Sequence, residues 1–234
     1  MINELLLIGS VVVIYGTVLL AYKLFGKAGM YAMTIIATVL ANIEVLILIE
    51  GFGMGQTLGN VMFASTYLIT DILSENEGKE SAAKAVWLGV FAAAVMLVFT
   101  QYWMLYTPAN ADWASPHISA IFSTTPRMLA ASLVGYIISQ RFDVWLYHKW
   151  WEWCKKHFGD SKKGLWIRNN GSTMISQLLN TLLYTFLAFY GTYSMQTLVS
   201  IFISSYALFC VTSLLDTPFV YWARIISEKH HGNN

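Results

Sequence analysis

Long, uninterrupted apolar runs constrain this chain more than any other feature of its sequence. Several of them reach about 20 residues, the length that an α-helix needs to cross the hydrocarbon core of a bilayer. Hydrophobic residues make up 56% of the 234 positions and charged residues only 12%, whereas a soluble domain carries roughly a quarter charged residues. The sequence therefore predicts an all-α, polytopic transmembrane helical bundle that forms a single domain, residues 1–234.

About seven spans can be placed on these runs. They cover residues 2–22, 30–50, 56–73, 82–106, 126–147, 172–190 and 197–223. We expect the first span to be accessory to a six-span core, residues 30–226. The third span is the shortest and is polar at both ends, so its crossing needs a second argument.

The positions of Lys and Arg supply that argument, because cytoplasmic loops of membrane proteins carry an excess of both residues. Basic residues occur between spans one and two, three and four, and five and six, and after span seven. The alternate loops, residues 51–55, 109–125 and 191–196, contain neither Lys nor Arg. The third span must cross for this alternation to hold, and the alternation predicts an outer N-terminus and a cytoplasmic C-terminus.

Ionisable and carboxamide side chains inside the spans indicate function, since burying them in lipid is expensive. Helical spacing places them in stripes on one face of a span. These stripes are Asn60, Phe63, Tyr67, Asp71 and Glu75 in span three; Ser132, Tyr136, Gln140, Asp143 and Tyr147 in span five; and Thr173, Gln177, Asn180 and Tyr184 in span six. Span seven adds Asp216 before Thr217 and Pro218, where we expect a kinked helix. Span two adds Asn42 and Glu44, which point about 200° apart.

Most of these side chains fall in the predicted cytoplasmic half, so we expect them to surround a polar cavity there. Carboxylates, carboxamides and aromatic walls suit a planar heterocycle with several N–H donors, such as a guanine-like ring. The candidate substrate-binding residues are Asn42, Glu44, Phe63, Tyr67, Asp71, Gln140, Asp143, Gln177, Asn180 and Asp216. The competing interpretation is that such residues cap helices or form ion pairs, and we favour it for Glu75, Glu77 and Arg141.

Other chemistries find little support. The histidines lie in predicted loops or in the tail, and no metal-ligand spacing occurs inside a span, so we expect no metal, cofactor or enzymatic activity. The segment 148–168 combines tryptophans with lysines. This composition predicts contact with membrane lipid at the headgroup level rather than with nucleic acid.

Several motifs, in one order along the chain, resemble a known family. They are Phe63-Ala-Ser-Thr-Tyr-Leu-Ile-Thr-Asp71-Ile-Leu-Ser-Glu75, Gly135-Tyr-Ile-Ile-Ser-Gln140-Arg-Phe-Asp143, Asn169-Asn-Gly-Ser-Thr173 with Gln177 and Asn180, and Asp216-Thr-Pro218. From about residue 41 to 226 the chain resembles the queuosine precursor transporter family, also called the vitamin uptake transporter family. The resemblance implies a multi-pass protein of the bacterial inner membrane that imports 7-deazaguanine precursors of the tRNA nucleoside queuosine.

The substrate and the mode of transport stay open. Some family members have Asp where this chain has Asn180, so the cyano form, the aminomethyl form and queuine are all candidates. A rival interpretation is a substrate-binding membrane subunit of a multi-component vitamin or nucleobase importer, because a separate ATPase would not be visible in this sequence. The sequence also leaves open the driving force and whether the protein forms a homo-oligomer.

Overall fold

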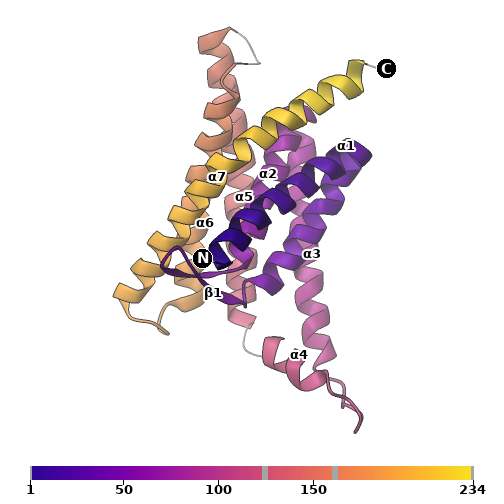
Figure 1. Ribbon diagram of the computed structural model, residues 1–234, viewed down its shortest axis with the longest axis vertical. Coiled ribbons are helices and arrows are strands. Elements are labelled where there is room, and N and C mark those ends of the chain that lie inside the picture. The colour runs from indigo at the N-terminus through magenta and orange to yellow at the C-terminus, as the bar shows by residue number, and fades with distance from the viewer. Residues whose placement is uncertain (1, 123–125, 160–162, 233–234) are drawn as a thin grey trace.

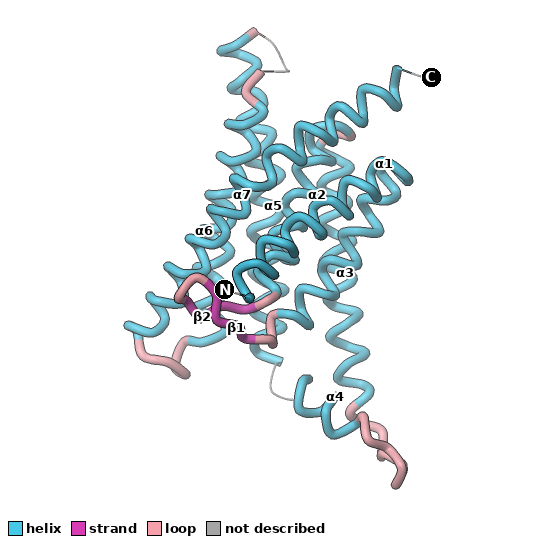
Figure 2. The backbone as a smooth tube through the Cα atoms, viewed as in Figure 1, coloured by secondary structure: helices cyan, strands magenta, loops and turns pink. Residues whose placement is uncertain are grey.

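The computed structural model describes residues 2–122, 126–159 and 163–232 and shows a bundle of long helices (Figure 1). The helices are α1 (Ile2–Glu44), α2 (Gly59–Asn76), α3 (Lys79–Trp103), α4 (Ser115–Phe122), α5 (Pro126–Phe158), α6 (Leu165–Phe189) and α7 (Met195–Gly232). A small antiparallel hairpin of β1 (Leu48–Gly51) and β2 (Met54–Thr57) joins α1 to α2 (Figure 2). The predicted all-α class is confirmed.

α1 is a helical hairpin rather than one straight rod. Its 43 residues would extend about 65 Å if straight. Instead, Asn3 Nδ2 donates to the Glu50 carbonyl at 2.7 Å, which brings the beginning of α1 beside the chain that follows its end. The reversal occurs at Gly26, whose φ of 56° and ψ of −138° suit only glycine. The two arms correspond to the first two predicted spans.

The crossing of the two arms depends on Gly29. A methyl group there would collide with the Ala21 carbonyl, whereas one on Gly16, in the same helix, would meet nothing within 4 Å. We expect Gly29→Ala to lower the free energy of unfolding by about 1–3 kcal/mol, because backbone atoms cannot move aside as a flexible side chain can. Gly16→Ala should be neutral or stabilising by up to about 1 kcal/mol, since alanine favours helix. Thermal unfolding in detergent compares the two variants, and equal melting temperatures would contradict the tight crossing.

The helix ends gather on two sides of the bundle (Figure 1). We call one the hairpin side: it holds the N-terminus, the β-hairpin, α4 and the turn between α6 and α7. The other is the basic side, where Lys27 Nζ lies 3.7 Å from Glu77 Oε2 and Arg224 Nη1 lies 3.7 Å from Glu75 Oε1. These contacts place the break in α1 near Gly26, the C-terminal end of α2 and the C-terminal part of α7 at one end of the bundle.

Two predicted boundaries are wrong. Span two does not continue to residue 50, because α1 ends at Glu44 and Phe52 and Gly53, both with positive φ, make the two-residue turn of the β-hairpin. The connection 148–168 is largely helical, apart from residues 160–162, which lie outside the described residues. α5 continues to Phe158 because no glycine or proline interrupts it before Gly159, and leaving the apolar region does not by itself end a helix.

α7 contains Pro218 within a helix that continues from Met195 to Gly232, so the proline does not end or divide it. Asp216 is therefore presented by a continuous helix. The kink expected at this proline stays a prediction.

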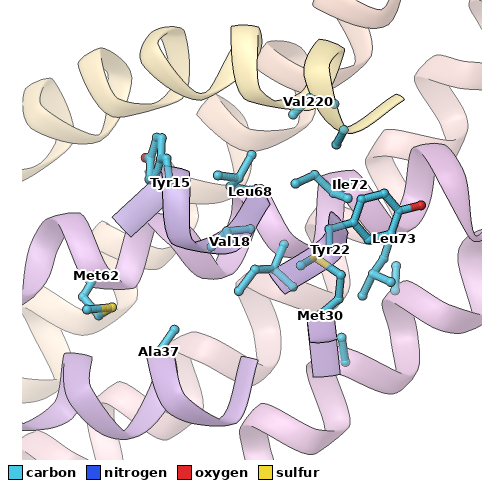
Figure 3. Close-up of a cluster of buried hydrophobic side chains, with 14 of the residues drawn as sticks. Tyr15, Val18, Tyr22, Met30, Ala37, Met62, Leu68, Ile72, Leu73 and Val220 are labelled. Atoms are coloured by element: carbon cyan, nitrogen blue, oxygen red, sulfur yellow. The ribbon is translucent and has the colours of Figure 1, made fainter. Parts of the chain in front are cut away.

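α2 occupies the centre of the bundle. Every residue from position 64 to position 74 is buried, and α2 packs against α1, α3, α5 and α7. Figure 3 shows part of this core, in which Leu68, Ile72 and Leu73 of α2 meet Val18 of α1 and Val220 of α7. Since apolar neighbours surround most of α2, its polar side chains can find hydrogen-bond partners mainly on the polar stripes of the other helices.

The apolar surface of the bundle is that of a polytopic membrane protein. Among the described residues, α1, α3 and α7 are long and apolar enough to cross a membrane, and α4 with α5 would make a further span. α2 lies in the centre and α6 carries a run of buried polar residues, including Asn169, Asn170 and Gln177. The predicted total of seven spans and their orientation stay predictions.

Candidate substrate-binding site

A cavity of about 440 Å³ opens on the hairpin side of the bundle. Its volume lies within the roughly 300–1,000 Å³ typical of small-molecule sites. The second arm of α1, the β-hairpin, α2, α5, α6 and α7 all contribute to its wall. Its polar and aromatic lining includes Asn42, Gln56, Asn60, Phe63, Ser132, Asn180, Tyr184, Ser204, Ser205 and Phe209.

The structure divides the candidate residues from the sequence between two levels. Asn42, Phe63 and Asn180 line the cavity. The remaining ones, apart from Glu44, are buried deeper in the bundle, on the basic side of the cavity: Tyr67, Asp71, Gln140, Asp143, Gln177 and Asp216. Glu44 is partly exposed and lines neither level. This cavity is therefore on the hairpin side and does not include the deeper carboxylates, whose contact with substrate stays a prediction.

Aromatic rings separate these two levels. Phe63 lies with its ring centroid 5.8 Å from that of Tyr67, 6.1 Å from that of Tyr136 and 6.1 Å from that of Phe209. We call Phe63, Tyr67, Tyr136 and Phe209 the aromatic floor. Along α2, Phe63, Tyr67 and Asp71 follow at four-residue steps, about one helical turn each. The floor thus lies between the cavity and the carboxylate of Asp71.

Hydrogen bonds connect the cavity to the floor. Tyr67 Oη donates to Ser139 Oγ at 2.8 Å, and Ser139 Oγ lies 3.3 Å from Oδ1 of Asn180, a residue of the cavity wall. Gln140 is held separately: its Nε2 donates to Thr66 Oγ1 at 2.7 Å, while its Oε1 accepts from Thr70 Oγ1 at 3.2 Å. A change at Asn180 can consequently reach Tyr67 through one intervening hydroxyl.

Beneath the floor lie Asp71, Asp143 and Asp216, which we call the acidic cluster. Their exposures are 0%, 0% and 1%, and they interact electrostatically with one another. Each neutral partner satisfies only part of a carboxylate. Thr173 Oγ1 donates to Asp71 Oδ2 at 2.8 Å, and Asn169 Nδ2 donates to Asp216 Oδ1 at 2.7 Å.

Several buried polar atoms around the cluster have no partner among the described residues. They are Asp71 Oδ1, both carboxylate oxygens of Asp143, Ser176 Oγ and Gln177 Oε1. Unsatisfied buried polar atoms are rare in native structures, because each costs the free energy of its lost hydration. This cluster is therefore poised to bind something that supplies hydrogen-bond donors.

An ion-pair network closes the bundle on the basic side of the acidic cluster. Arg168 forms a bidentate pair with Glu75, with Nε to Oε2 at 2.8 Å and Nη2 to Oε1 at 2.5 Å. Tyr147 Oη donates to Glu75 Oε2 at 2.7 Å, and the guanidinium of Arg168 lies 4.3 Å from the centroid of the Trp151 ring. We call Glu75, Arg168, Tyr147 and Arg224 the ionic closure, because they join α2, α5, α6 and α7.

Sequence reasoning missed part of this arrangement. Arg168 was counted among loop basic residues, yet its side chain is fully buried in the first turn of α6. The available sequence signal was its position directly before two asparagines, Asn169 and Asn170, which the structure also buries. Gln56, Ser204 and Phe209 gave no comparable signal, because their places in the wall depend on how the β-hairpin and α7 fold over the cavity.

A central cavity in a membrane bundle, with buried carboxylates beneath it, defines the class of small-molecule transporters. Residues 57–223 match the sequence family described as "Putative vitamin uptake transporter". This match spans most of the chain, and the protein belongs to that family.

A curated relative supports the same assignment. The "Probable queuosine precursor transporter" of Bacillus subtilis (strain 168) is 39% identical over 207 residues, which cover 88% of each chain. No solved structure matches this chain significantly.

Proposed function

We propose that this protein imports 7-deazaguanine precursors of queuosine across the bacterial inner membrane, as a multi-pass transporter rather than an enzyme. The observation that carries the proposal is the order of features along α2. A cavity with carboxamide and aromatic walls is followed by the aromatic floor and then by partly unsatisfied carboxylates. The name of the Bacillus subtilis relative supports the substrate class.

The chemistry of each level suits a different stage of binding. In the cavity, Phe63 and Tyr184 supply aromatic faces for a planar ring, and Asn42 and Asn180 supply amide donors and acceptors. A deazaguanine also presents adjacent ring N–H and amino donors, which a single carboxylate accepts well. Asp71 and Asp143 would receive those donors once the aromatic floor moves aside.

The two sides of the bundle suggest a direction for the cycle. With the N-terminus outside, the cavity faces the exterior and the ionic closure faces the cytoplasm. Import then requires the ionic closure to separate while the floor and the hairpin side close, which is alternating access around a fixed site.

Asn180 offers a test of recognition in the cavity. Asn180→Ala is expected to weaken binding of 7-cyano-7-deazaguanine by about 5- to 150-fold, because a hydrogen bond in a desolvated site contributes roughly 1–3 kcal/mol. Asn76→Ala is the matched control, since Asn76 donates to the Ile72 carbonyl at the opposite end of α2. Titration calorimetry on the purified protein measures both. Equal affinities for the two variants would remove Asn180 from the site.

Uptake in cells tests the whole proposal. Cells that can neither synthesise nor take up deazaguanines, but keep the enzymes that use them, should regain queuosine in tRNA when they express this protein and receive a labelled precursor. The label should enter chemically unchanged, because no reaction is proposed. Normal expression of the protein without restored queuosine would contradict the assignment.

A further inference from the structure

The arginines on the basic side of the acidic cluster contact other carboxylates. Arg168, the buried cation on its basic side, is already committed to Glu75 through two short hydrogen bonds. Arg224 lies 3.7 Å from the same Glu75 and 3.8 Å from Glu228. The partners of Asp71 and Asp216 that form hydrogen bonds are the neutral Thr173 and Asn169. Adjacent carboxylates in a low-dielectric interior repel strongly unless a proton neutralises one of them.

Asp71 and Asp143 form the critical pair. The Asp143 carboxyl lies close to Asp71 and to the hydroxyls of Ser172 and Ser176, yet neither of its oxygens forms a well-aligned hydrogen bond with a described residue. Other titratable groups surround the pair on every side. They are Tyr67 and Glu75 of α2, Tyr147 of α5, Arg168 of α6 behind Glu75, Asp216 of α7, and Tyr15 of α1 behind Asp216.

We propose that the Asp71–Asp143 pair binds one proton and that this proton is the coupling ion of transport. The inference rests on the proposed function and adds its driving force. One ionised carboxylate can accept the N–H donors of the substrate, while the proton on the other removes the repulsion between the two. Proton and neutral substrate therefore bind together more favourably than either does alone.

The proton balance of the cycle follows from that linkage. On the outer side, an O–H bond forms on one carboxyl of the pair as a proton leaves water, and the substrate occupies the other carboxylate. After the ionic closure opens, the substrate departs and the O–H bond breaks, so that the proton passes to cytoplasmic water. One proton enters with each substrate molecule, and no covalent bond of the substrate changes.

The geometry favours a proton over a metal ion as the coupling ion. A sodium ion needs several oxygen ligands around a space of its own, whereas a proton needs none. Neither Asp71 nor Asp143 lines the cavity. Within the part of the chain that the structure describes, no group of three or more His, Cys, Asp and Glu side chains is placed to hold a metal ion.

Reconstituted full-length protein with a pH dye in the vesicle lumen tests the coupling. Addition of 7-cyano-7-deazaguanine outside should acidify the lumen. With one proton per substrate, an inward gradient of about one pH unit should support about tenfold accumulation, and an inward sodium gradient should add nothing. In Asp143→Asn the ratio of uptake with and without the pH gradient should fall to about one. Asp112→Asn, which changes a partly buried carboxylate in the connection before α4, outside the acidic cluster, should keep the wild-type ratio.

Exchange of labelled for unlabelled substrate, measured without any gradient, separates the two hypotheses. If the wild-type protein exchanges substrate but net uptake does not acidify the lumen, or if sodium alone stimulates uptake, proton coupling is overturned and the proposed function stays intact. A pH-gradient ratio in Asp143→Asn equal to that of the wild type would also overturn the assignment to this pair. Absence of exchange in folded wild-type protein would overturn both proposals.

Discussion

Replacing Asp71 with Asn should reduce deazaguanine uptake by about 100-fold or more. The variant keeps the shape of the side chain and loses the negative charge that accepts two N–H donors, and hydrogen bonds to a charged group contribute roughly 1.5–3 kcal/mol each. Because asparagine is uncharged and nearly isosteric at this fully buried position, the protein should remain folded. The initial rate of uptake, normalised to the amount of protein in the membrane, measures the effect.

The control for this experiment is Glu80→Gln, which removes an exposed carboxylate from the first turn of α3. Its uptake should stay within about twofold of wild type, because surface charges contribute little. The double variant Asp71→Asn with Gln177→Ala removes two of the deep acceptors. Wild-type uptake by that variant would show that the deep level is not part of the substrate path.

The largest effect on stability is expected at Arg168. Arg168→Gln leaves Glu75 buried, with its side chain 3% exposed, and without its bidentate partner. Breaking a buried ion pair from one side costs about 3–5 kcal/mol, which corresponds to a fall of about 6–20 °C in melting temperature for a chain of this size. Thermal unfolding in detergent, monitored as the loss of monodisperse protein with temperature, measures this shift in melting temperature.

The exposed pair Lys149–Glu152 provides a matched comparison. Its side chains are 54% and 72% exposed, so Lys149→Gln should cost less than about 1 kcal/mol. The double variant Glu75→Gln with Arg168→Gln should recover part of the loss, because no uncompensated charge then remains. If Lys149→Gln and Arg168→Gln lowered the melting temperature equally, the ionic closure would not hold the helices together as described.

The class of the fold was predictable because the bilayer imposes strong rules on sequence. Apolar runs and the alternation of Lys and Arg indicated a polytopic bundle, and the contact between Asn3 and Glu50 agrees with two antiparallel arms in α1. Helical periodicity also grouped Phe63, Tyr67 and Asp71 correctly on one face of α2, since this spacing depends only on local geometry.

The parts that were not predictable depend on tertiary contacts. Periodicity tells which residues share a helix face but not which neighbouring helix that face meets, so the separation of Asn180 from Asp143 by an aromatic floor was invisible. The burial of Arg168 depends on Glu75, almost a hundred positions away in the sequence. The β-hairpin was missed because its strands are short and its pairing is stabilised partly by the N-terminus of α1.

The most direct test of the central claim is uptake by the purified protein alone in proteoliposomes. Labelled 7-cyano-7-deazaguanine should enter vesicles that contain the wild-type chain, in a saturable manner, and should not enter empty vesicles or vesicles with Asp71→Asn. This result would show that one chain both binds the deazaguanine and carries it across the membrane. Tight binding of the ligand by folded protein without any uptake would contradict the account and would indicate a substrate-binding subunit that depends on a separate ATPase.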